Sequence, residues 1–254
     1  MRNRVSGNLF APFALFCGNS TAVSRINWLF LPPVPAYAAA MNCIVTAGPT
    51  IERLDDVRRL TNFSTGRLGT ELANFFTARG HKVALLISES ATYAGERRAQ
   101  TVKTFSTTAD LRAKLKSFSR KKVDAVFHAA AVSDFAFGTI FAETKTGEFT
   151  ALKKNKKIPT RQGNLLVELL PTPKIIAELR GWFSRAKIIG WKYEANGGRA
   201  DVLRAAEKQM ADCATDACVA NGPAYGKGFN LVLAGGQKKH FSSAAKLFSA
   251  LESI

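Results

Sequence analysis

Residues 61–69 (TNFSTGRLG) have the composition of an anion-binding turn. Polar side chains and two glycines lead into a stretch whose apolar residues have helical spacing. Backbone amides at the start of a helix attract anions, and glycine lets a phosphate approach them closely. Arg58, Arg59 and Arg67 add positive charge around the turn. The pattern predicts a phosphate or carboxylate site, with a ligand-free loop as the alternative on spacing alone.

Two common nucleotide-binding motifs are absent from the sequence. It contains no Walker A sequence (GxxxxGK followed by Ser or Thr), which argues against a P-loop. It also has no GxGxxG after the first predicted strand, which argues against an NAD(P)-dependent Rossmann-type reductase. Glu89, near the end of the second predicted strand, keeps the reductase as an alternative, because such enzymes have an acidic residue there.

Basic residues outnumber acidic ones, and the net charge is +17. Such a charge suits phosphorylated small molecules, nucleic acid or anionic membranes. The densest cluster consists of Lys153, Lys154, Lys156 and Lys157. A basic nucleic-acid-binding module is a second alternative, but no RNP, KH or zinc-finger pattern supports it. The four cysteines lack metal-ligand spacing, so we expect no metal site and reduced thiols, as in cytoplasmic proteins.

Hydrophobic patterning predicts the elements that position these residues. Apolar runs predict strands at residues 42–47, 82–88, 123–131, 165–170, 187–191, 217–220 and 230–233. Helical spacing predicts helices at residues 66–79, 108–118, 172–183, 201–211 and 242–251. Residues 135–161 form a long basic and polar stretch. The alternation predicts an α/β fold, a doubly wound and mostly parallel Rossmann-like sheet with helices on both faces.

Ligands of such sheets bind beyond the carboxyl ends of the strands. Four residues of suitable chemistry follow predicted strands, namely Gly48, Asp134, Trp191 and Asn221. We therefore expect these residues and the anion-binding turn to meet at one edge of the sheet.

The first forty residues differ in composition from the rest. Arg2 and Arg4 precede interrupted apolar patches and a proline-rich stretch, and Met41 stands directly before the first predicted strand. We expect a poorly ordered extension over residues 1–40 and a single domain over residues 41–254. The apolar patches are too interrupted to span a bilayer, and an export signal is the alternative interpretation.

Several motifs, in order, resemble the phosphopantothenoylcysteine synthetases, also called phosphopantothenate–cysteine ligases. The motifs are VTAGPT at residues 45–50, DDVR at 55–58, NFSTGRLG at 62–69, AAAVSDF at 129–135, KNKK at 154–157 and IIGWKYE at 188–194. The AN pair at residues 220–221 and GFN at 228–230 resemble the last segment of the family. The resemblance covers about residues 41–254 and implies a stand-alone ligase that needs a separate decarboxylase.

The resemblance implies a two-step ligation in coenzyme A biosynthesis. The carboxylate of 4′-phosphopantothenate attacks the α-phosphate of a nucleoside triphosphate, which Mg2+ accompanies. An acyl-nucleotidyl anhydride forms and pyrophosphate leaves. The amine of cysteine then attacks the acyl carbon and releases the nucleoside monophosphate. The resemblance also implies a homodimer that binds these small molecules, and neither nucleic acid nor membranes.

Individual roles follow from the same resemblance. Asn62 is expected to hold the acyl intermediate and Lys154 to stabilise charge in the first step, so both are candidate catalytic residues. The expected substrate-binding residues are Arg58, Ser64, Gly66, Arg67 and Gly69. The expected nucleotide-binding residues are Gly48, Asp134, Lys154, Lys157, Trp191 and Asn221. The alternatives are a solvated loop for the lysines and core packing for Trp191, and we expect His128 to be structural.

The motifs resemble two subgroups of the family that use different nucleotides. KNKK resembles the bacterial, CTP-using pattern, whereas Lys192 and the NFS and AVSDF segments resemble the eukaryotic, ATP-using pattern. CTP and ATP both remain as expected nucleotides. The segment after Asn221 lacks the acidic residue often found there in the family, so we assign it no role.

Overall fold

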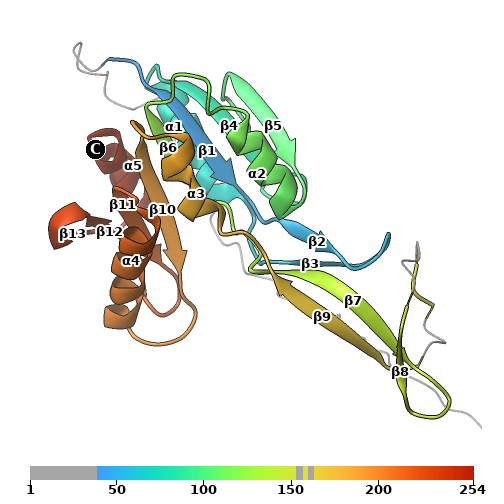
Figure 1. Ribbon diagram of the computed structural model, residues 1–254. Coiled ribbons are helices and arrows are strands. Elements are labelled where there is room, and N and C mark those ends of the chain that lie inside the picture. Colours follow the sequence, from blue (N-terminus) through green and yellow to red (C-terminus); the bar gives the residue numbers. More distant parts are fainter. Residues whose placement is uncertain (1–38, 153–156, 160–162) are drawn as a thin grey trace, which may run out of the picture. The chain divides into compact units, whose positions relative to one another are not determined.

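The computed structural model describes residues 39–152, 157–159 and 163–254. The main sheet consists of β1 (Asn42–Ala47), β4 (Lys82–Ser88), β5 (Thr101–Phe105), β6 (Ala125–His128), β10 (Lys187–Tyr193), β11 (Ala217–Asn221), β12 (Phe229–Leu233) and β13 (Lys238–Phe241). Its order is β13-β12-β11-β10-β6-β1-β4-β5 (Figure 1). The strands from β5 to β11 in this order are parallel, and β12 and β13 are antiparallel. The predicted doubly wound, Rossmann-like sheet is therefore confirmed.

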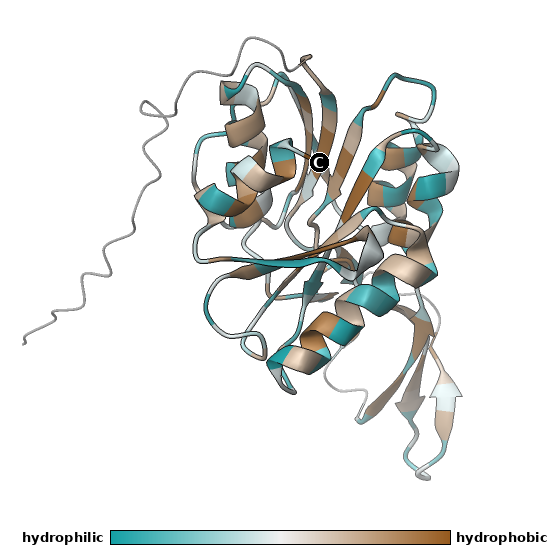
Figure 2. Cartoon of the chain, turned by 90° about the vertical axis from the view of Figure 1, so that its left-hand side faces the viewer, coloured by the Kyte–Doolittle hydropathy of each residue, from teal (hydrophilic) through white to brown (hydrophobic). Residues whose placement is uncertain are grey.

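Helices cover both faces of the main sheet, also as predicted. They are α1 (Arg67–Ala78), α2 (Thr108–Lys116), α3 (Ile175–Trp182), α4 (Arg199–Cys213) and α5 (Ala244–Glu252). On one face, Leu111 of α2 and Leu179 of α3 belong to the same buried cluster as Val126 of β6. On the other face, the ring of Phe76 of α1 lies 4.7 Å from that of Phe127, the next residue of β6. Strands buried on both sides read as continuous apolar runs, and Figure 2 shows hydrophobic residues concentrated in this sheet.

Glycines mark both ends of α1. Gly66 precedes the helix with a φ of 78° and Gly80 follows it with a φ of 84°. At the C-terminal end, the amide of His81 donates to the carbonyl of Phe76 at 3.0 Å. Glycine adopts positive φ angles without steric cost, so Gly80 ends this helix close to the predicted residue 79.

The prediction of one polar stretch over residues 135–161 is wrong for its described part. This part contains β7 (Phe135–Glu143) and β8 (Phe149–Ala151), which form a second, antiparallel sheet with β9 (Leu165–Pro171) in the order β8-β7-β9. A bulge between Phe137 and Ile140 interrupts the β7–β9 pairing and the side-chain alternation. Glu168 accepts a hydrogen bond from the amide of Thr139 in the bulge, at 2.9 Å. The strand expected at residues 165–170 exists, but it pairs with β7 and not with the main sheet.

The other strands missed from the sequence are short or polar. A hairpin of β2 (Ile51–Arg53) and β3 (Arg59–Thr61) lies within the expected loop after β1. β5 and β13 are the two edges of the main sheet and are mostly exposed, so they lack the apolar runs of central strands.

The expected N-terminal extension, apart from residues 39 and 40, lies outside the described residues. Within the described part of the chain, no helix has the length and apolar character needed to cross a membrane.

Candidate active site

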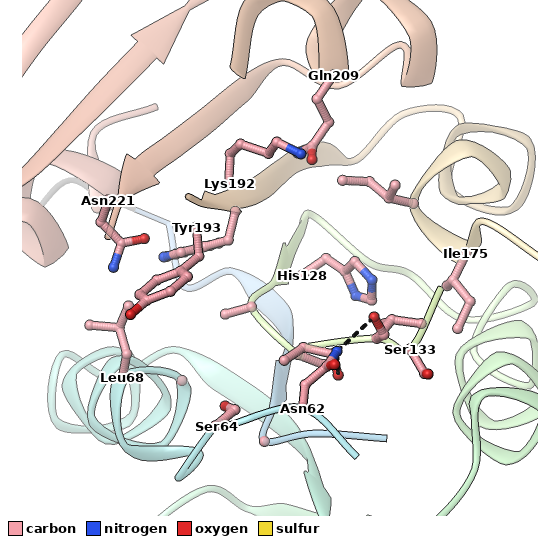
Figure 3. Close-up of a pocket in the computed structure, with 18 of the residues that line it drawn as sticks. Asn62, Ser64, Leu68, His128, Ser133, Ile175, Lys192, Tyr193, Gln209 and Asn221 are labelled. Atoms are coloured by element: carbon pink, nitrogen blue, oxygen red, sulfur yellow. Dashed lines mark hydrogen bonds between the residues drawn. The ribbon is translucent and has the colours of Figure 1, made fainter. Parts of the chain in front are cut away.

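A cavity of about 1190 Å³ lies at the carboxyl ends of the central strands, and Figure 3 shows part of its lining. It is lined by residues that follow β1 and β6, by the N-terminal turn of α1, by the ends of β10 and β11, and by parts of α3 and α4. Chain order runs outward in opposite directions from β1 and β6, so the cavity lies at the topological switch point. The predicted edge of the sheet is confirmed.

The N-terminal turn of α1 forms one wall. Ser64, Gly66, Arg67 and Gly69 all line the cavity. The N-cap residue Gly66 has no side chain to cap the helix, Thr65 Oγ1 accepts only from the Arg67 amide at 3.3 Å, and no acidic residue lies in the first turn. The next backbone amides of this turn and the positive end of the helix dipole therefore suit an anion.

Two glycines of this region are required by packing. A Cβ atom on Gly69 would lie 2.6 Å from Cβ of Ala47 and 2.9 Å from the carbonyl oxygen of Thr46. Gly48 has a φ of +84°, and a Cβ there would lie 2.8 Å from Cβ of Ser88. Gly69 therefore allows α1 to pack closely on β1, which places the α1 amides at the cavity whether or not Gly69 contacts a ligand.

Arg67 forms an ion pair beside the cavity. Its Nε donates to Oε1 of Glu71 at 2.7 Å, and this bond raises the pKa of Arg67. The buried Glu71 also accepts a hydrogen bond from the Tyr93 hydroxyl at 3.2 Å. Glu71 thus neutralises part of the positive charge that Arg67 brings to this wall.

Asn62 is fixed to the loop after β6. Its Nδ2 donates to the carbonyl oxygens of Val132 at 3.1 Å and Ala131 at 3.4 Å (Figure 3). Asn62 lines the cavity, as does Asp134 further along the same loop. Asp134 does not directly follow a strand as expected, because β6 ends at His128.

Arg58 does not line the cavity and instead closes a turn in the β2–β3 hairpin. Its guanidinium pairs with Asp55 and donates to the carbonyl oxygen of Ile158 at 2.8 Å. The fully buried Asp55 carboxylate also accepts from the amides of Val57 at 2.9 Å, Arg58 at 2.7 Å and Ile158 at 3.1 Å. The Arg58 hydrogen bond, joined by these amides, holds the pKa of Asp55 well below its usual range. We call this arrangement the Asp55–Arg58 clamp.

Of the two candidate lysines, Lys154 and Lys157, only Lys157 is among the described residues. Lys154 lies outside the described residues. Lys157 is described and exposed, and it does not line the cavity. It directly precedes the buried Ile158, which the clamp holds.

The wall assigned to the nucleotide contains Trp191 and Asn221, as expected. Both residues lie within strands, in β10 and β11, and not after them. The indole nitrogen of Trp191 and Oδ1 of Asn221 are buried without a hydrogen-bond partner among the described residues. Tyr193, which pairs with Asn221 in the sheet register, is largely exposed and also lines the cavity (Figure 3).

Four further lining residues were not among the site residues expected from the sequence. They are Lys174, Lys192, Lys208 and Gln209. Nζ of Lys192 pairs with Oε1 of Glu194 at 3.0 Å. Lys192 was visible only as a departure from a motif, and Gln209 lies mid-helix in α4 with no local signal.

His128, expected to be structural, also lines the cavity. It is 6% exposed, and its Nδ1 lies 3.0 Å from Oγ1 of Thr46 on β1. The amide of Ala130 donates to the same hydroxyl oxygen at 3.0 Å. Burial lowers the pKa of His128 to about 4, so its imidazole is neutral at pH 7.

No cluster of three or more His, Cys, Asp or Glu side chains among the described residues could hold a metal ion. Glu71, Asp134 and Asp212 are the carboxylates of the cavity lining. Glu71 pairs with Arg67, and Asp212 pairs with Lys208 at 3.1 Å. This donor set fits a magnesium ion that enters with phosphate groups and keeps several waters better than it fits an all-protein metal site.

A family model described as the DNA/pantothenate metabolism flavoprotein C-terminal domain matches residues 38–235. Over 189 residues the chain is 31% identical to the coenzyme A biosynthesis bifunctional protein CoaBC of Thermococcus kodakarensis. This match covers 74% of this chain and 42% of that protein. Over 231 residues it is 29% identical to CoaBC of Bacillus subtilis, and this match covers 88% of this chain and 52% of that protein. The chain thus spans about half the length of these curated relatives.

Solved structures share the fold. The DNA/pantothenate metabolism flavoprotein of Streptococcus pneumoniae matches with a TM-score of 0.73 at 23% identity, over 84% of this chain and 97% of that chain. A Cab2 mutant in complex with phosphopantothenate-cysteine matches with a TM-score of 0.62 at 18% identity. This match covers 84% of this chain and 86% of that chain. At these identities the likeness concerns the fold alone.

Proposed function

This chain belongs to the DNA/pantothenate metabolism flavoprotein C-terminal domain family, and on that premise we propose that it ligates 4′-phosphopantothenate to cysteine. The names of the CoaBC relatives assign those proteins to coenzyme A biosynthesis. The Cab2 complex contains phosphopantothenate-cysteine, which is the product of the reaction proposed for this chain. The motif resemblance supports the same reaction.

One observation carries the proposal, namely the groups that converge on a single cavity. The N-terminal turn of α1, Asn62, Asp134 and Trp191 line it together. Its volume of about 1190 Å³ exceeds the roughly 300–1,000 Å³ typical of a pocket for one drug-sized ligand. A nucleotide and a second substrate therefore have room to bind side by side, as an acyl transfer between them requires.

The proposed first step joins the phosphopantothenate carboxylate to the α-phosphate and releases pyrophosphate. Charge builds on the phosphates, so the α1 amides are suited to stabilise this step. Lys154 and Lys157 keep their proposed roles at these phosphates. In the proposed second step the cysteine amine attacks the acyl carbon, while Asn62 holds the acyl group.

We further propose that the nucleotide is CTP or ATP and that Mg2+ accompanies it. Asp134 is the lining carboxylate that no described residue pairs with, so it is suited to reach a metal-bound water or the nucleotide. The unpartnered Trp191 nitrogen and Asn221 oxygen offer one donor and one acceptor near the proposed base site. Magnesium would neutralise charge on the triphosphate.

The proposed enzyme is a cytoplasmic homodimer. Large apolar side chains are exposed on the second sheet, at Phe135, Phe149, Leu166, Leu169 and Leu170, and such groups mark interaction surfaces. Cys43, Cys213 and Cys218 are free and buried, which suits a reducing compartment. Light scattering after gel filtration should give a dimer for the wild type and a monomer for Leu166→Glu/Leu170→Glu. A monomeric wild type would contradict this assembly.

A ligation assay tests the function. The protein is incubated with phosphopantothenate, cysteine, Mg2+ and either CTP or ATP, and pyrophosphate and the ligated product are measured. We expect both products with at least one nucleotide, and neither when phosphopantothenate is omitted. No release with either nucleotide overturns the proposal, and NADPH binding by calorimetry would then favour the reductase.

A further inference from the structure

His128 is a polar residue of the cavity wall whose hydrogen-bonding capacity is only half used. It ends β6 at the switch point, and its ring points into the cavity (Figure 3). One ring nitrogen, Nδ1, is bonded to Thr46. For the other, Nε2, the described residues supply no partner. The side chain is 6% exposed and lines the cavity, so a ligand there can complete its hydrogen bonding.

The contacts of Thr46 determine which ring nitrogen carries the proton. The Thr46 side chain is fully buried, and its oxygen already accepts from the amide of Ala130. Its own hydrogen needs an acceptor, and among the described residues Nδ1 of His128 is the one within reach. The satisfied arrangement has Thr46 donating to Nδ1, which leaves the proton of the neutral imidazole on Nε2.

Burial keeps this imidazole uncharged. With its pKa lowered to about 4, His128 is a weak proton acceptor at pH 7. A neutral ring held in one tautomer is well suited to donate a hydrogen bond to an oxygen that gains charge during a reaction.

We propose that His128 is a catalytic residue of the ligation, and that its Nε2–H donates to the carbonyl oxygen of the acyl intermediate. This inference rests on the proposed function. Thr46 is a positioning residue, because it orients the ring and selects the tautomer without touching substrate.

The proposed step concerns acyl transfer to cysteine. The amine nitrogen forms a bond to the acyl carbon, and the carbonyl electron pair moves to the oxygen, which His128 stabilises. The pair then returns as the bond from carbon to the phosphate oxygen breaks. The nucleoside monophosphate leaves, and the proton from nitrogen passes to the leaving phosphate or to water.

Nuclear magnetic resonance tests the arrangement without any substrate. Long-range correlations between ring protons and ¹⁵N distinguish the two neutral tautomers from imidazolium. In the labelled wild-type chain we expect His128 to be neutral with its proton on Nε2 at pH 7, and Thr46→Val to abolish this preference. The histidine signal that disappears in His128→Gln belongs to His128, and the one that disappears in His240→Gln belongs to His240. A proton on Nδ1, or an imidazolium, overturns the inference.

Single-turnover kinetics test the role. His128→Ala should slow transfer to cysteine about 100-fold, as expected for the loss of one oxyanion donor, and leave pyrophosphate release without cysteine unchanged. His128→Gln keeps an N–H donor and should recover about tenfold of that loss. Thr46→Val should slow the same step, whereas Thr215→Val, a buried threonine outside the cavity, should not.

Each outcome decides between the two proposals. Full-rate transfer by His128→Ala, or equal slowing of both steps, overturns the role of His128 and leaves the ligase function standing. Absence of ligation by the wild type overturns the proposed function itself. Should His128→Ala fail to fold, His128→Gln and the wild-type spectra decide.

Discussion

Arg58 and Asn62 flank the short strand β3, yet they belong to networks of opposite character. Arg58 forms a charged clamp with Asp55 that holds Ile158 outside the cavity. Asn62 and His128 belong to a neutral part of the cavity lining, with the buried Thr46 behind His128. We call this second region the neutral wall. The family resemblance implied a catalytic role for Asn62 and substrate binding for Arg58, so both were expected at the site.

The difference lies in which hydrogen-bonding groups remain free. In the clamp, one buried carboxylate collects three amides and a guanidinium, so the charges satisfy each other. In the neutral wall, His128 uses one nitrogen on Thr46 and keeps the other for the cavity. Satisfied charges hold chain segments in place, whereas half-satisfied neutral groups are available to a ligand.

The largest expected effect comes from removing a cavity group of the neutral wall. Asn62→Ala should lower the rate of ligation about 100-fold, because the amide proposed to hold the acyl group is lost. Its side chain is exposed, so the free energy of unfolding should change by less than about 0.5 kcal/mol. Asn164→Ala, an exposed asparagine bonded to Glu143 outside the cavity, is the matched control. Equal rates for the two variants would remove Asn62 from the site.

A packing change behind the wall should have the next largest effect. Gly69→Ala places a methyl group 2.6 Å from Cβ of Ala47 and should lower the free energy of unfolding by about 1–3 kcal/mol. Gly181→Ala in α3 meets no atom within 4 Å and should be neutral or stabilising. Chemical denaturation measures both. A fully stable Gly69→Ala variant would show that α1 can shift away from β1.

The clamp should respond to Asp55→Asn in a local way. The amide of Ile158 would lose its charged acceptor, so trypsin should cut after Lys157 roughly tenfold faster, as expected for loss of such a bond. Cleavage after Lys145, in the exposed turn between β7 and β8, is the internal control. Unchanged cleavage after Lys157 would mean that the clamp does not hold this segment.

Acidification should separate the two regions by pH. The pKa of His128 is lowered from 6.5 to about 4, so the unfolded chain binds the proton first and stability falls as the pH drops from 6.5 towards 4. The pKa of Asp55 is lowered from 3.8, so its contribution is present above that value and is lost only at lower pH. Denaturation midpoints across pH measure both windows. His128→Gln should remove the loss of stability between pH 6.5 and 4, and Asp55→Asn should remove the loss below pH 3.8. Loss of stability in one shared pH range would contradict the comparison.

Much of the fold was predictable because central strands and amphipathic helices have strong local patterns. β1, β4 and β11 are buried along nearly their whole length and appear as apolar runs. β7 was missed, because a bulge breaks its pattern and many of its side chains are partly exposed. β5 and β13 were missed because edge strands are polar.

Much of the candidate site was predictable too, since the polar, glycine-containing turn before α1 and the polar residues near strand ends are local features of the sequence. Ser64, Gly66, Asp134 and Asn221 all line the cavity, as expected. The roles assigned to individual side chains through the resemblance remain predictions. Gln209 could not have been found, because nothing in its own helix distinguishes it from a surface residue.

Local chemistry along the chain was sufficient for the class of fold, the anion-binding turn and the edge of the sheet where ligands bind, because these depend on neighbours in sequence. Three-dimensional packing decided the rest. It brought Asp55 to Ile158 and Thr46 to His128, across 103 and 82 residues of chain. Whether a polar group is consumed by a partner or left free for a ligand depends on such distant contacts, and therefore on the folded structure.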